Sequence, residues 1–490
     1  MTTHTTGDDF GRTTARAATW AFLSGSGTKI VTLVGLTLLA RLLAPAEFGL
    51  LAFALTYIVY VDTIADLGSG TALIYWPDRR DDAAQVTFII NVAAGIFWCG
   101  LTFVLAPYIA DFFNAPQGTA IVRALSGTFF VKYLGNTHDA LMRKDLRFHS
   151  AAVPEVSMAL VKMGVSLVLA WRGFGAWSLV WGHLAGLVAW TVLLWVMIPW
   201  RPSWRFPRDL FKPMLAYGRG IIFVNVLSSI QHQTDLLMIS RWQGLTALGL
   251  YQLAGKIPEA TVAMIYRVAS DVLLPAFSRV SAAGESTKRV YLAAARYVGA
   301  ATLPIATGLA LLAQPFVLLF FGPKWVAAAP IVSALAVLSG IRALSAQPGD
   351  VLKATGRVGL MARLGFLRVV LIVIAVVVAA RYSALAVAVA LVIVDGAATL
   401  LAFSVTSRAI GVSLSEVGRA FAPSFTASAG MAAALLAWMR WGPALPLLPG
   451  VIVAVVLGGI VFVAILSMTD RQILGEARSV FSARKAAKQP

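Results

Sequence analysis

Ten lysine and arginine residues lie inside stretches of the sequence that are otherwise apolar. Burying a charge in an apolar medium is costly, so each of these side chains should face either a cavity or a partner of opposite charge. Five of them have no acidic residue at helical spacing. This pattern predicts an anionic ligand, and phosphate or diphosphate suits lysine and arginine best. The five are Lys29, Lys132, Lys162, Arg219 and Arg342.

The other five cations have closer explanations. Lys256 has Glu259 three residues further along, and Arg267 has Asp271 four residues further along. Both spacings permit an ion pair on one helix face, although both cations are also candidate ligands of the same anion. The last three lie near the ends of their apolar stretches, where a long side chain can reach the polar boundary. They are Arg123, Arg296 and Arg368.

Four aspartates also fall inside apolar stretches. Two of them, Asp62 and Asp66, are four residues apart and share one helix face, and the others are Asp235 and Asp395. Carboxylates in such surroundings can take up and release protons or hold a cation. The alternative is that each one pairs with a basic residue on another helix.

The composition indicates which elements position these side chains. Of the 490 residues, 59% are hydrophobic and only 13% are charged, whereas a soluble globular chain has about 25% charged residues. The mean hydropathy is +0.80. A helix needs about 20 apolar residues to cross a bilayer with every backbone polar group paired, and runs such as 369–380 are typical of such helices. The sequence therefore predicts an all-α polytopic membrane protein.

Apolar stretches between charged or Gly/Pro-rich breaks predict about 14 transmembrane helices. The stretch 119–140 is the weakest of them because it contains three basic side chains, Arg123, Lys132 and His138. The approximate ranges are 18–40, 48–74, 84–106, 119–140, 151–171, 174–198, 214–240, 246–276, 292–321, 327–349, 360–380, 383–406, 417–439 and 447–468.

The remaining lysines and arginines alternate between the two sides of the predicted membrane. With a cytoplasmic N-terminus, 24 of the 40 lie in inside segments and 6 lie in outside segments. This bias follows the positive-inside rule and places both termini in the cytoplasm. Much of the net charge of +18 is therefore a topology signal attracted to anionic lipid. It does not indicate a nucleic-acid partner.

One motif occurs twice at an offset of 200 residues. The words "LARLLAPAEFGLLAFA" (39–54) and "ISRWQGLTALGLYQLA" (239–254) share Arg41 with Arg241 and Gly49 with Gly249. Further pairs follow in the same order, "APYIADFFNAP" with "QPFVLLFFGP" and "MRKDLR" with "LKATGR". Spans 1–6 and 7–12 are thus predicted to be two parallel copies of a six-helix unit, related by an axis along the membrane normal. A cleft between two such halves suits transport by rocking, and a static scaffold would leave the intramembrane cations unexplained.

The predicted domain organisation follows from these copies. Residues 1–17 form a cytoplasmic tail, 18–200 the first lobe, 201–213 a cytoplasmic linker and 214–408 the second lobe. Two further helices occupy 409–468, and 469–490 form a basic cytoplasmic tail.

Several of these words together resemble the bacterial polysaccharide exporters, the O-antigen and exopolysaccharide flippases of the multidrug/oligosaccharidyl-lipid/polysaccharide superfamily. The resemblance covers roughly residues 15–410 and is greatest to the colanic acid and succinoglycan exporter-like branch. It rests on "LARLLAPAEFGLLA", "ADLGSGTALI", "APYIADFF", "RKDLRF", "GFGAWSLVWG", "DLLMISRWQGLTALGLYQLAGKI", "LLPAFSRV", "FGPKW" and "LKATGR".

This resemblance implies a V-shaped pair of six-helix lobes plus two C-terminal helices in the bacterial inner membrane. It implies alternating access and an undecaprenyl-diphosphate-linked oligosaccharide as cargo, moved from the cytoplasmic to the periplasmic leaflet for exopolysaccharide or O-antigen synthesis. A polysaccharide polymerase and chain-length machinery are the further partners to expect. No cofactor is expected, and an H⁺ or Na⁺ gradient could drive the cycle through the four aspartates.

Other functions remain open on the sequence alone. A lipid II flippase would carry a similar polyprenyl diphosphate, and a cation-coupled multidrug antiporter of the same superfamily would favour acids over unpaired cations. A membrane glycosyltransferase or polymerase would need a sizeable extramembrane site, and no outside loop exceeds about 15 residues. The sequence contains no P-loop motif, and its five histidines and one cysteine are scattered rather than spaced as metal ligands. The prediction is a transporter and not an enzyme.

Overall fold

The computed structural model is all-helical over the residues that it describes. These are 31–66, 68–76, 79–145, 148–203, 205–282 and 287–470. Within them, the side chains of 148–149, 219–224 and 263–282 are outside the description. The chain divides into two compact units, Met1–Gly249 and Leu250–Pro490.

The first unit begins with a short apolar helix, Val31–Leu42. It continues with α2 (Pro45–Ala65), α3 (Ser69–Tyr75), α4 (Arg80–Phe112), the 3-10 turn η1 (Pro116–Gly118), α5 (Thr119–Lys144), α6 (Phe148–Trp171) and α7 (Ala176–Met197). Helix α8 (Arg208–Ala282) begins in this unit and runs into the next. Gly244 interrupts α8 with non-helical backbone (φ 81°, ψ −179°), which separates two predicted spans.

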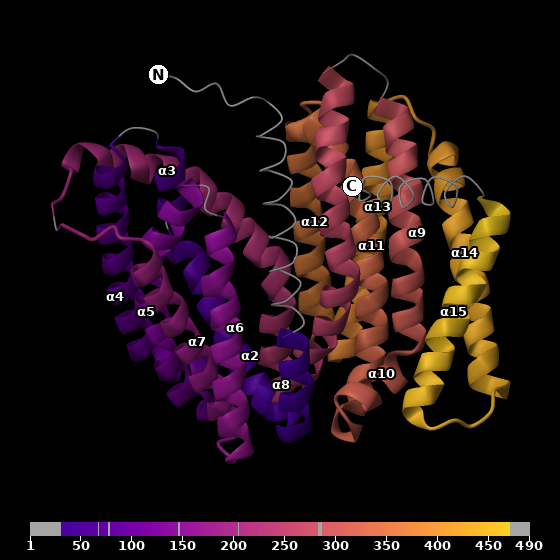
Figure 1. The fold of residues 1–490 in the computed structure, drawn as a ribbon, viewed down its shortest axis with the longest axis horizontal. Coiled ribbons are helices and arrows are strands. Elements are labelled where there is room, and N and C mark those ends of the chain that lie inside the picture. Colours follow the sequence, from indigo (N-terminus) through magenta and orange to yellow (C-terminus); the bar gives the residue numbers. More distant parts are fainter. Residues whose placement is uncertain are drawn as a thin grey trace, which may run out of the picture. The chain divides into compact units, whose positions relative to one another are not determined.

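The second unit follows with α9 (Thr287–Leu311), α10 (Ala313–Phe320), η2 (Pro323–Ala328), α11 (Ala329–Ala354), α12 (Val358–Ala379) and α13 (Ala384–Ala409). Its last two helices are α14 (Leu414–Trp441) and α15 (Leu447–Thr469). These two pack against each other, as Figure 1 shows at the yellow end of the chain.

The helices occupy the predicted apolar stretches wherever the structure describes them, but not every stretch is one straight helix. Among the described residues, nine helices are long and apolar enough to cross a membrane, or ten if the bent pair α9 and α10 is one span. That pair bends by 73°. The predicted span 48–74 is broken at Gly68, whose positive φ of 64° ends α2 and lets α3 begin. The range 18–40 lies mostly outside the described residues, so the total of 14 stays a prediction.

The packing order within each unit supports the predicted duplication. In the first unit α4 packs on α5, α6 on α7, and α5 on α7. In the second unit α9 packs on α11, α12 on α13, and α11 on α13. A residue with positive φ, Asn114 or Gly322, precedes the 3-10 turn in each unit. The two units therefore repeat one local design.

The doubled motif places two glycines at a close helix crossing inside the first unit. A Cβ atom added to Gly49 would lie 1.7 Å from the carbonyl oxygen of Leu245, and one added to Gly249 would lie 1.9 Å from that of Pro45. Leu245 is the repeat equivalent of Pro45, so the contact is reciprocal. The crossing requires glycine at both positions, which explains why the motif keeps both.

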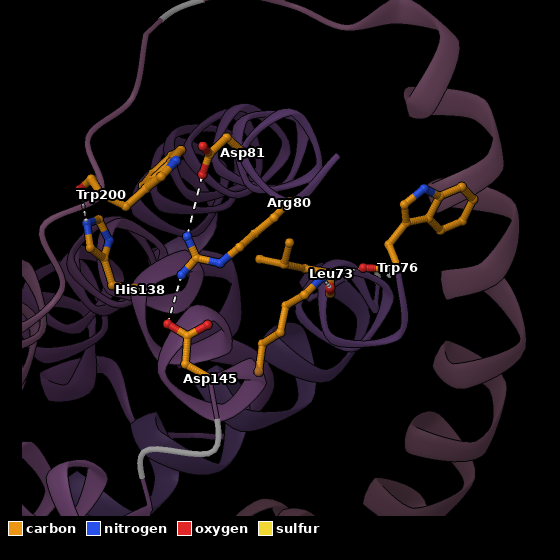
Figure 2. A network of polar contacts seen from close by, with 8 residues as sticks. Leu73, Trp76, Arg80, Asp81, His138, Asp145 and Trp200 are labelled. Carbon is orange, nitrogen blue, oxygen red and sulfur yellow. Dashed lines mark hydrogen bonds and ion pairs between the residues drawn. The ribbon is translucent and has the colours of Figure 1, made fainter. Parts of the chain in front are cut away.

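A polar network holds the last turns of α5 against its neighbours (Figure 2). Arg80 at the start of α4 lies 2.8 Å from the Asp145 carboxylate and 3.5 Å from that of Asp81. The His138 ring on α5 lies 3.2 Å from the carbonyl oxygen of Trp200 (Figure 2). Lys144 donates to the carbonyl oxygens of Leu73, at 2.9 Å, and Trp76. These contacts fix α5 between α3, α4 and the segment after α7.

A further ion pair joins this end of the unit to the first turn of α8. Arg79 donates hydrogen bonds to Asp82, at 2.9 Å, and to Asp209. The hydrogen bond from Arg79 holds the pKa of the exposed Asp209 carboxyl below its ordinary value. The start of α8 is thereby connected to the loop before α4.

Replacing Lys144 with methionine is expected to lower the free energy of unfolding by about 1–2 kcal/mol, because two carbonyl oxygens lose a charged donor. Thermal unfolding of the detergent-purified protein, followed by tryptophan fluorescence, measures the change. The matched control is Lys212→Met at an exposed position on α8, which should leave the unfolding temperature unchanged. Equal effects of the two substitutions would contradict a structural role for Lys144.

Candidate functional site

The first candidate site lies in the first unit, where α2 meets α5. The Lys132 ammonium is 2.5 Å from the Asp62 carboxylate. The Tyr133 hydroxyl donates to the other oxygen of the same carboxylate at 3.2 Å. Neither charged side chain is fully buried, with 34% of Lys132 and 23% of Asp62 exposed. Part of the Lys132 side chain therefore stays accessible while it is paired.

Three more ionisable groups surround this pair. Asp66 follows Asp62 by one helical turn, and Lys132 acts on it electrostatically. Lys162 on α6 and Lys132 both act electrostatically on His183 of α7. The two ring nitrogens of His183 are buried and have no hydrogen-bond partner among the described residues. We refer to Asp62, Asp66, Lys132, Lys162 and His183 as the first-unit cluster.

Close packing of α6 on α7 positions two members of this cluster. A Cβ atom on Gly186 would lie 2.9 Å from the Cβ of Lys162, and one on Gly182 would lie 1.9 Å from the hydroxyl oxygen of Ser166. The absence of side chains at these glycines lets the two helices approach closely. Lys162 thereby lies close enough to His183 to act on it electrostatically.

The second candidate site lies in the second unit and consists of two arginines on one aspartate. The Nε atom of Arg342 on α11 donates to one carboxylate oxygen of Asp395 at 2.7 Å, and the Nε atom of Arg368 on α12 donates to the other at 2.7 Å. Asp395 on α13 has no exposed surface, whereas 37% of Arg342 and 22% of Arg368 are exposed. We refer to Arg342, Arg368 and Asp395 as the arginine triad. With two guanidiniums and one carboxylate, it carries a surplus of one positive charge.

Lys132 and Arg342 occupy equivalent positions in the two units. Each is the fourteenth residue of a 26-residue helix that follows a 3-10 turn. When the two helices are aligned from their first residues, buried positions coincide without a gap. Leu125 and Leu335 are one such pair. Helices α5 and α11 thus carry a cation at the same mid-helix position.

The hypothesis of cations without carboxylate partners is wrong for Lys132 and Arg342. Neither has a partner along its own helix, but each has one across helices, Asp62 and Asp395 respectively. The structure confirms the alternative for Asp62 and Asp395, which is that each pairs with a basic residue on another helix. A binding role must therefore rest on the partly exposed side chain of Lys132 and on the surplus charge of the arginine triad.

The other predicted residues have varied surroundings. Lys256 pairs with Glu259 at 2.9 Å, as its spacing predicts. Asp235 accepts a hydrogen bond from the backbone N–H of Leu236 at 2.8 Å. Three candidate cations are not tested, because Lys29 and the side chains of Arg219 and Arg267 lie outside the described residues. The structure therefore brings together Lys132, Lys162, Asp62 and Asp66 in one cluster, and Arg342 and Asp395 in another.

The cations assigned to span ends differ among themselves. Arg296 forms a partly buried ion pair with Asp470, with a 2.9 Å hydrogen bond from its Nε atom, and Arg123 lies 5.2 Å from the centre of the Phe103 ring. Arg368 is not at a helix end, since it is the eleventh of the 22 residues of α12. The prediction that it reaches a polar boundary is wrong, because its charge is met by Asp395 at mid-helix.

The sequence did not predict Tyr133 or His183 as site residues, and Arg368 was assigned to a span end. Arg368 could have been recognised from its central position in an apolar stretch. His183 and Tyr133 could not, because their place depends on which helix faces meet. Among the described residues, no group of histidine, cysteine, aspartate and glutamate could hold a metal ion.

With these clusters described, comparison with known proteins identifies the family. Residues 38–330 match the family described as "Polysaccharide biosynthesis protein", which is more than half of the chain. The chain belongs to this family. It is a polysaccharide biosynthesis and export protein of the multidrug/oligosaccharidyl-lipid/polysaccharide superfamily, as the sequence words predict. The family consists of membrane transporters and not of enzymes.

Two family members illustrate the relationship. The chain is 24% identical to the succinoglycan biosynthesis transport protein ExoT of Rhizobium meliloti (strain 1021), over 98% of each chain. It is 26% identical to the lipopolysaccharide biosynthesis protein WzxC of Escherichia coli (strain K12), over 77% of each chain. Both relatives match most of this family member's length.

Solved structures identify the fold of this family member. The lipid II flippase MurJ in an inward closed conformation aligns with a TM-score of 0.76 at 13% identity, over 93% of this chain and 99% of that one. An inward-facing multidrug resistance transporter of the MATE family aligns with a TM-score of 0.64 at 14% identity, over 78% and 94% respectively. The protein is therefore a multi-pass membrane protein with a MurJ/MATE-like fold.

Proposed function

We propose that this transporter moves an undecaprenyl-diphosphate-linked oligosaccharide from the cytoplasmic to the periplasmic leaflet of the bacterial inner membrane, for exopolysaccharide or O-antigen synthesis. Family membership supports the class of cargo. The observation that carries the proposal is that the equivalent mid-helix cations, Lys132 and Arg342, stay 34% and 37% exposed although each has a carboxylate partner. Cations at this depth are expensive unless they serve a partner or a ligand, and a diphosphate would be such a ligand.

The proposed cycle is alternating access by two parallel six-helix lobes with both termini in the cytoplasm. The diphosphate replaces part of its hydration by contacts with Lys132 and Lys162 of the first-unit cluster, while most of the polyprenyl chain stays in lipid. A change in the relative orientation of the lobes then weakens these contacts and releases the headgroup on the other side. The positive-inside distribution of lysine and arginine supports this topology.

The aspartates divide into two groups in this proposal. Asp395 has no exposed surface and is held by two arginines, so its role is to stabilise the triad. Asp62 and Asp66 are partly exposed members of one cluster, and they are the better candidates for coupling to an H⁺ or Na⁺ gradient. Asp235 remains a further candidate on α8.

Replacing Lys132 with glutamine is expected to reduce polymer export at least about tenfold, equivalent to about 1.4 kcal/mol, because the headgroup loses a charged ligand. Export is measured as secreted or surface polymer in a strain whose only copy of the gene carries the variant, with the protein level checked in membranes. Lipid-linked oligosaccharide should accumulate in the inner leaflet. Lys132→Arg keeps the charge and should retain most export.

A double variant separates ligand binding from ion pairing. Asp62→Asn with Lys132→Gln removes the pair without leaving an unpaired charge. If Lys132 serves only to neutralise Asp62, this double variant should restore export, which would contradict the proposal. If Lys132 contacts the cargo, the double variant should stay as defective as Lys132→Gln alone, and Asp62→Asn alone measures how much of that defect comes from lost ion coupling.

A lipid II flippase is the second candidate, favoured by the TM-score of 0.76 to MurJ. Its cargo is also a polyprenyl diphosphate, so the charge clusters do not discriminate. Deletion of the gene distinguishes the two functions. Loss of a lipid II flippase blocks wall synthesis, whereas loss of an exopolysaccharide flippase leaves viable cells without polymer. The polysaccharide family match and the similarity to ExoT favour the exporter.

A further inference from the structure

A cavity of about 260 Å³ lies beside the arginine triad in the second unit. Residues of α11, α12 and α13 line it, and most of them are apolar; the polar side chains of its lining are those of Ser345, Thr399 and Arg368. Gly349 and Gly365 line it too, and a Cβ atom added to either would meet nothing within 4 Å. The wall of the cavity thus includes two glycines without close neighbours and the side chain of Arg368.

The volume of this cavity limits the size of its occupant. Pockets for whole drug-sized ligands measure about 300–1,000 Å³, so this cavity suits a segment of one chain rather than a complete two-chain lipid. Phe366, Leu367 and Leu371 on α12 are exposed by 57%, 44% and 39%. This apolar surface indicates that α12 borders the hydrocarbon of the bilayer, from which a chain can enter.

Arg368 brings the arginine triad to the wall of the cavity. Each arginine donates its Nε hydrogen to Asp395, and the terminal amino groups have no other partner among the described residues. Those groups form the fork that binds phosphate bidentately. With one carboxylate against two guanidiniums, a bound phosphate would meet a surplus positive charge.

The depth of Arg368 distinguishes between two sources of phosphate. Arg368 is at the middle of α12, about 16 Å from either end at 1.5 Å per residue. Bilayer phospholipids keep their phosphates outside a hydrocarbon core that is about 30 Å thick. A phosphate at this depth therefore belongs to a lipid that is being moved across the membrane.

We propose that the cavity between α11, α12 and α13 is a transit subsite for a polyprenyl phosphate or diphosphate, with its phosphate on the terminal amino groups of Arg342 and Arg368 and its first isoprene units in the cavity. This inference rests on the proposed function, since it assumes an isoprenoid cargo. It adds a second contact for the same lipid, separate from the first-unit cluster. It also assigns Arg368, Gly349 and Gly365 a role that the sequence did not indicate.

The test fills the cavity without touching the charges. Gly365→Leu puts a side chain into the open space, and Gly359→Leu is the matched control, because it lies on the same helix, also has open space, and does not line the cavity. Binding of undecaprenyl phosphate to the detergent-purified full-length protein is measured by native mass spectrometry. Gly365→Leu and Arg368→Gln should each weaken binding about tenfold, and Gly359→Leu should leave it unchanged.

Two comparison lipids identify the occupant. Undecaprenol, which lacks phosphate, should bind at least tenfold more weakly than undecaprenyl phosphate, and phosphatidylglycerol should not displace the latter at equal concentration. Equal binding of undecaprenol, displacement by phosphatidylglycerol, or normal binding to Gly365→Leu would each overturn the inference. If Gly365→Leu binds and exports normally while gene deletion abolishes polymer, only this inference fails. If deletion leaves polymer export intact, the proposed function fails.

Discussion

Replacing Gly49 with alanine is expected to lower the free energy of unfolding by about 3 kcal/mol and to abolish most polymer export. The new methyl group would lie 1.7 Å from a backbone carbonyl oxygen of α8, and a backbone atom cannot rotate away as a flexible side chain can. The two helices must therefore separate, and overpacking of this kind typically costs about 1–3 kcal/mol. Gly249→Ala should have a similar effect because the contact is reciprocal.

Two other glycines provide controls for this prediction. Gly100 on α4 and Gly127 on α5 lie inside helices, and a Cβ atom added to either meets nothing within 4 Å. Alanine is favoured over glycine within a helix by about 1 kcal/mol, so these substitutions should maintain or raise stability. Thermal unfolding in detergent and polymer export measure all four variants. If Gly49→Ala is as stable as Gly127→Ala, the crossing does not depend on glycine.

Helix positions and local pairs could be predicted because their signals lie close together in sequence. Apolar runs predict the positions of the helices, and a spacing of three residues predicts the pair Lys256–Glu259, which the structure confirms at 2.9 Å. The repeat was also recognisable, since an offset of 200 residues preserves both Gly49 and Gly249. The contact of each glycine with the other's helix could not be predicted, because similarity between two segments does not imply that they lie close together.

Partners on different helices could not be predicted from spacing. Lys132 and Asp62 are 70 residues apart, and Arg342 and Asp395 are 53 apart. Which cation meets which carboxylate depends on the helix faces that pack together, and apolar helices with nearly uniform hydrophobicity do not reveal those faces. For the same reason the bend between α9 and α10 was not predicted, since hydropathy averages over one apolar run without recording its direction.

Arg342→Gln and Asp395→Asn are expected to separate stability from transport in the second unit. Asp395→Asn leaves two guanidiniums side by side without a carboxylate, and removal of one partner from a buried charge pair costs about 3–5 kcal/mol. Arg342→Gln leaves Asp395 paired with Arg368, so its cost should stay below about 1 kcal/mol, as for a partly exposed pair. It removes the surplus positive charge, however, and export should fall at least about tenfold, equivalent to about 1.4 kcal/mol.

The combination of the two substitutions makes this interpretation testable. In the double variant one guanidinium no longer repels another, so its stability should exceed that of Asp395→Asn alone, and the difference measures the coupling between the two residues. Thermal unfolding and polymer export are followed for each variant, with Arg342→Lys as the control that keeps the charge but loses the bidentate fork. Normal export by Arg342→Gln at a normal membrane level would show that the surplus charge does not serve an anion. The triad would then be a structural ion network, because its only demonstrable effect would be on the stability of α11, α12 and α13.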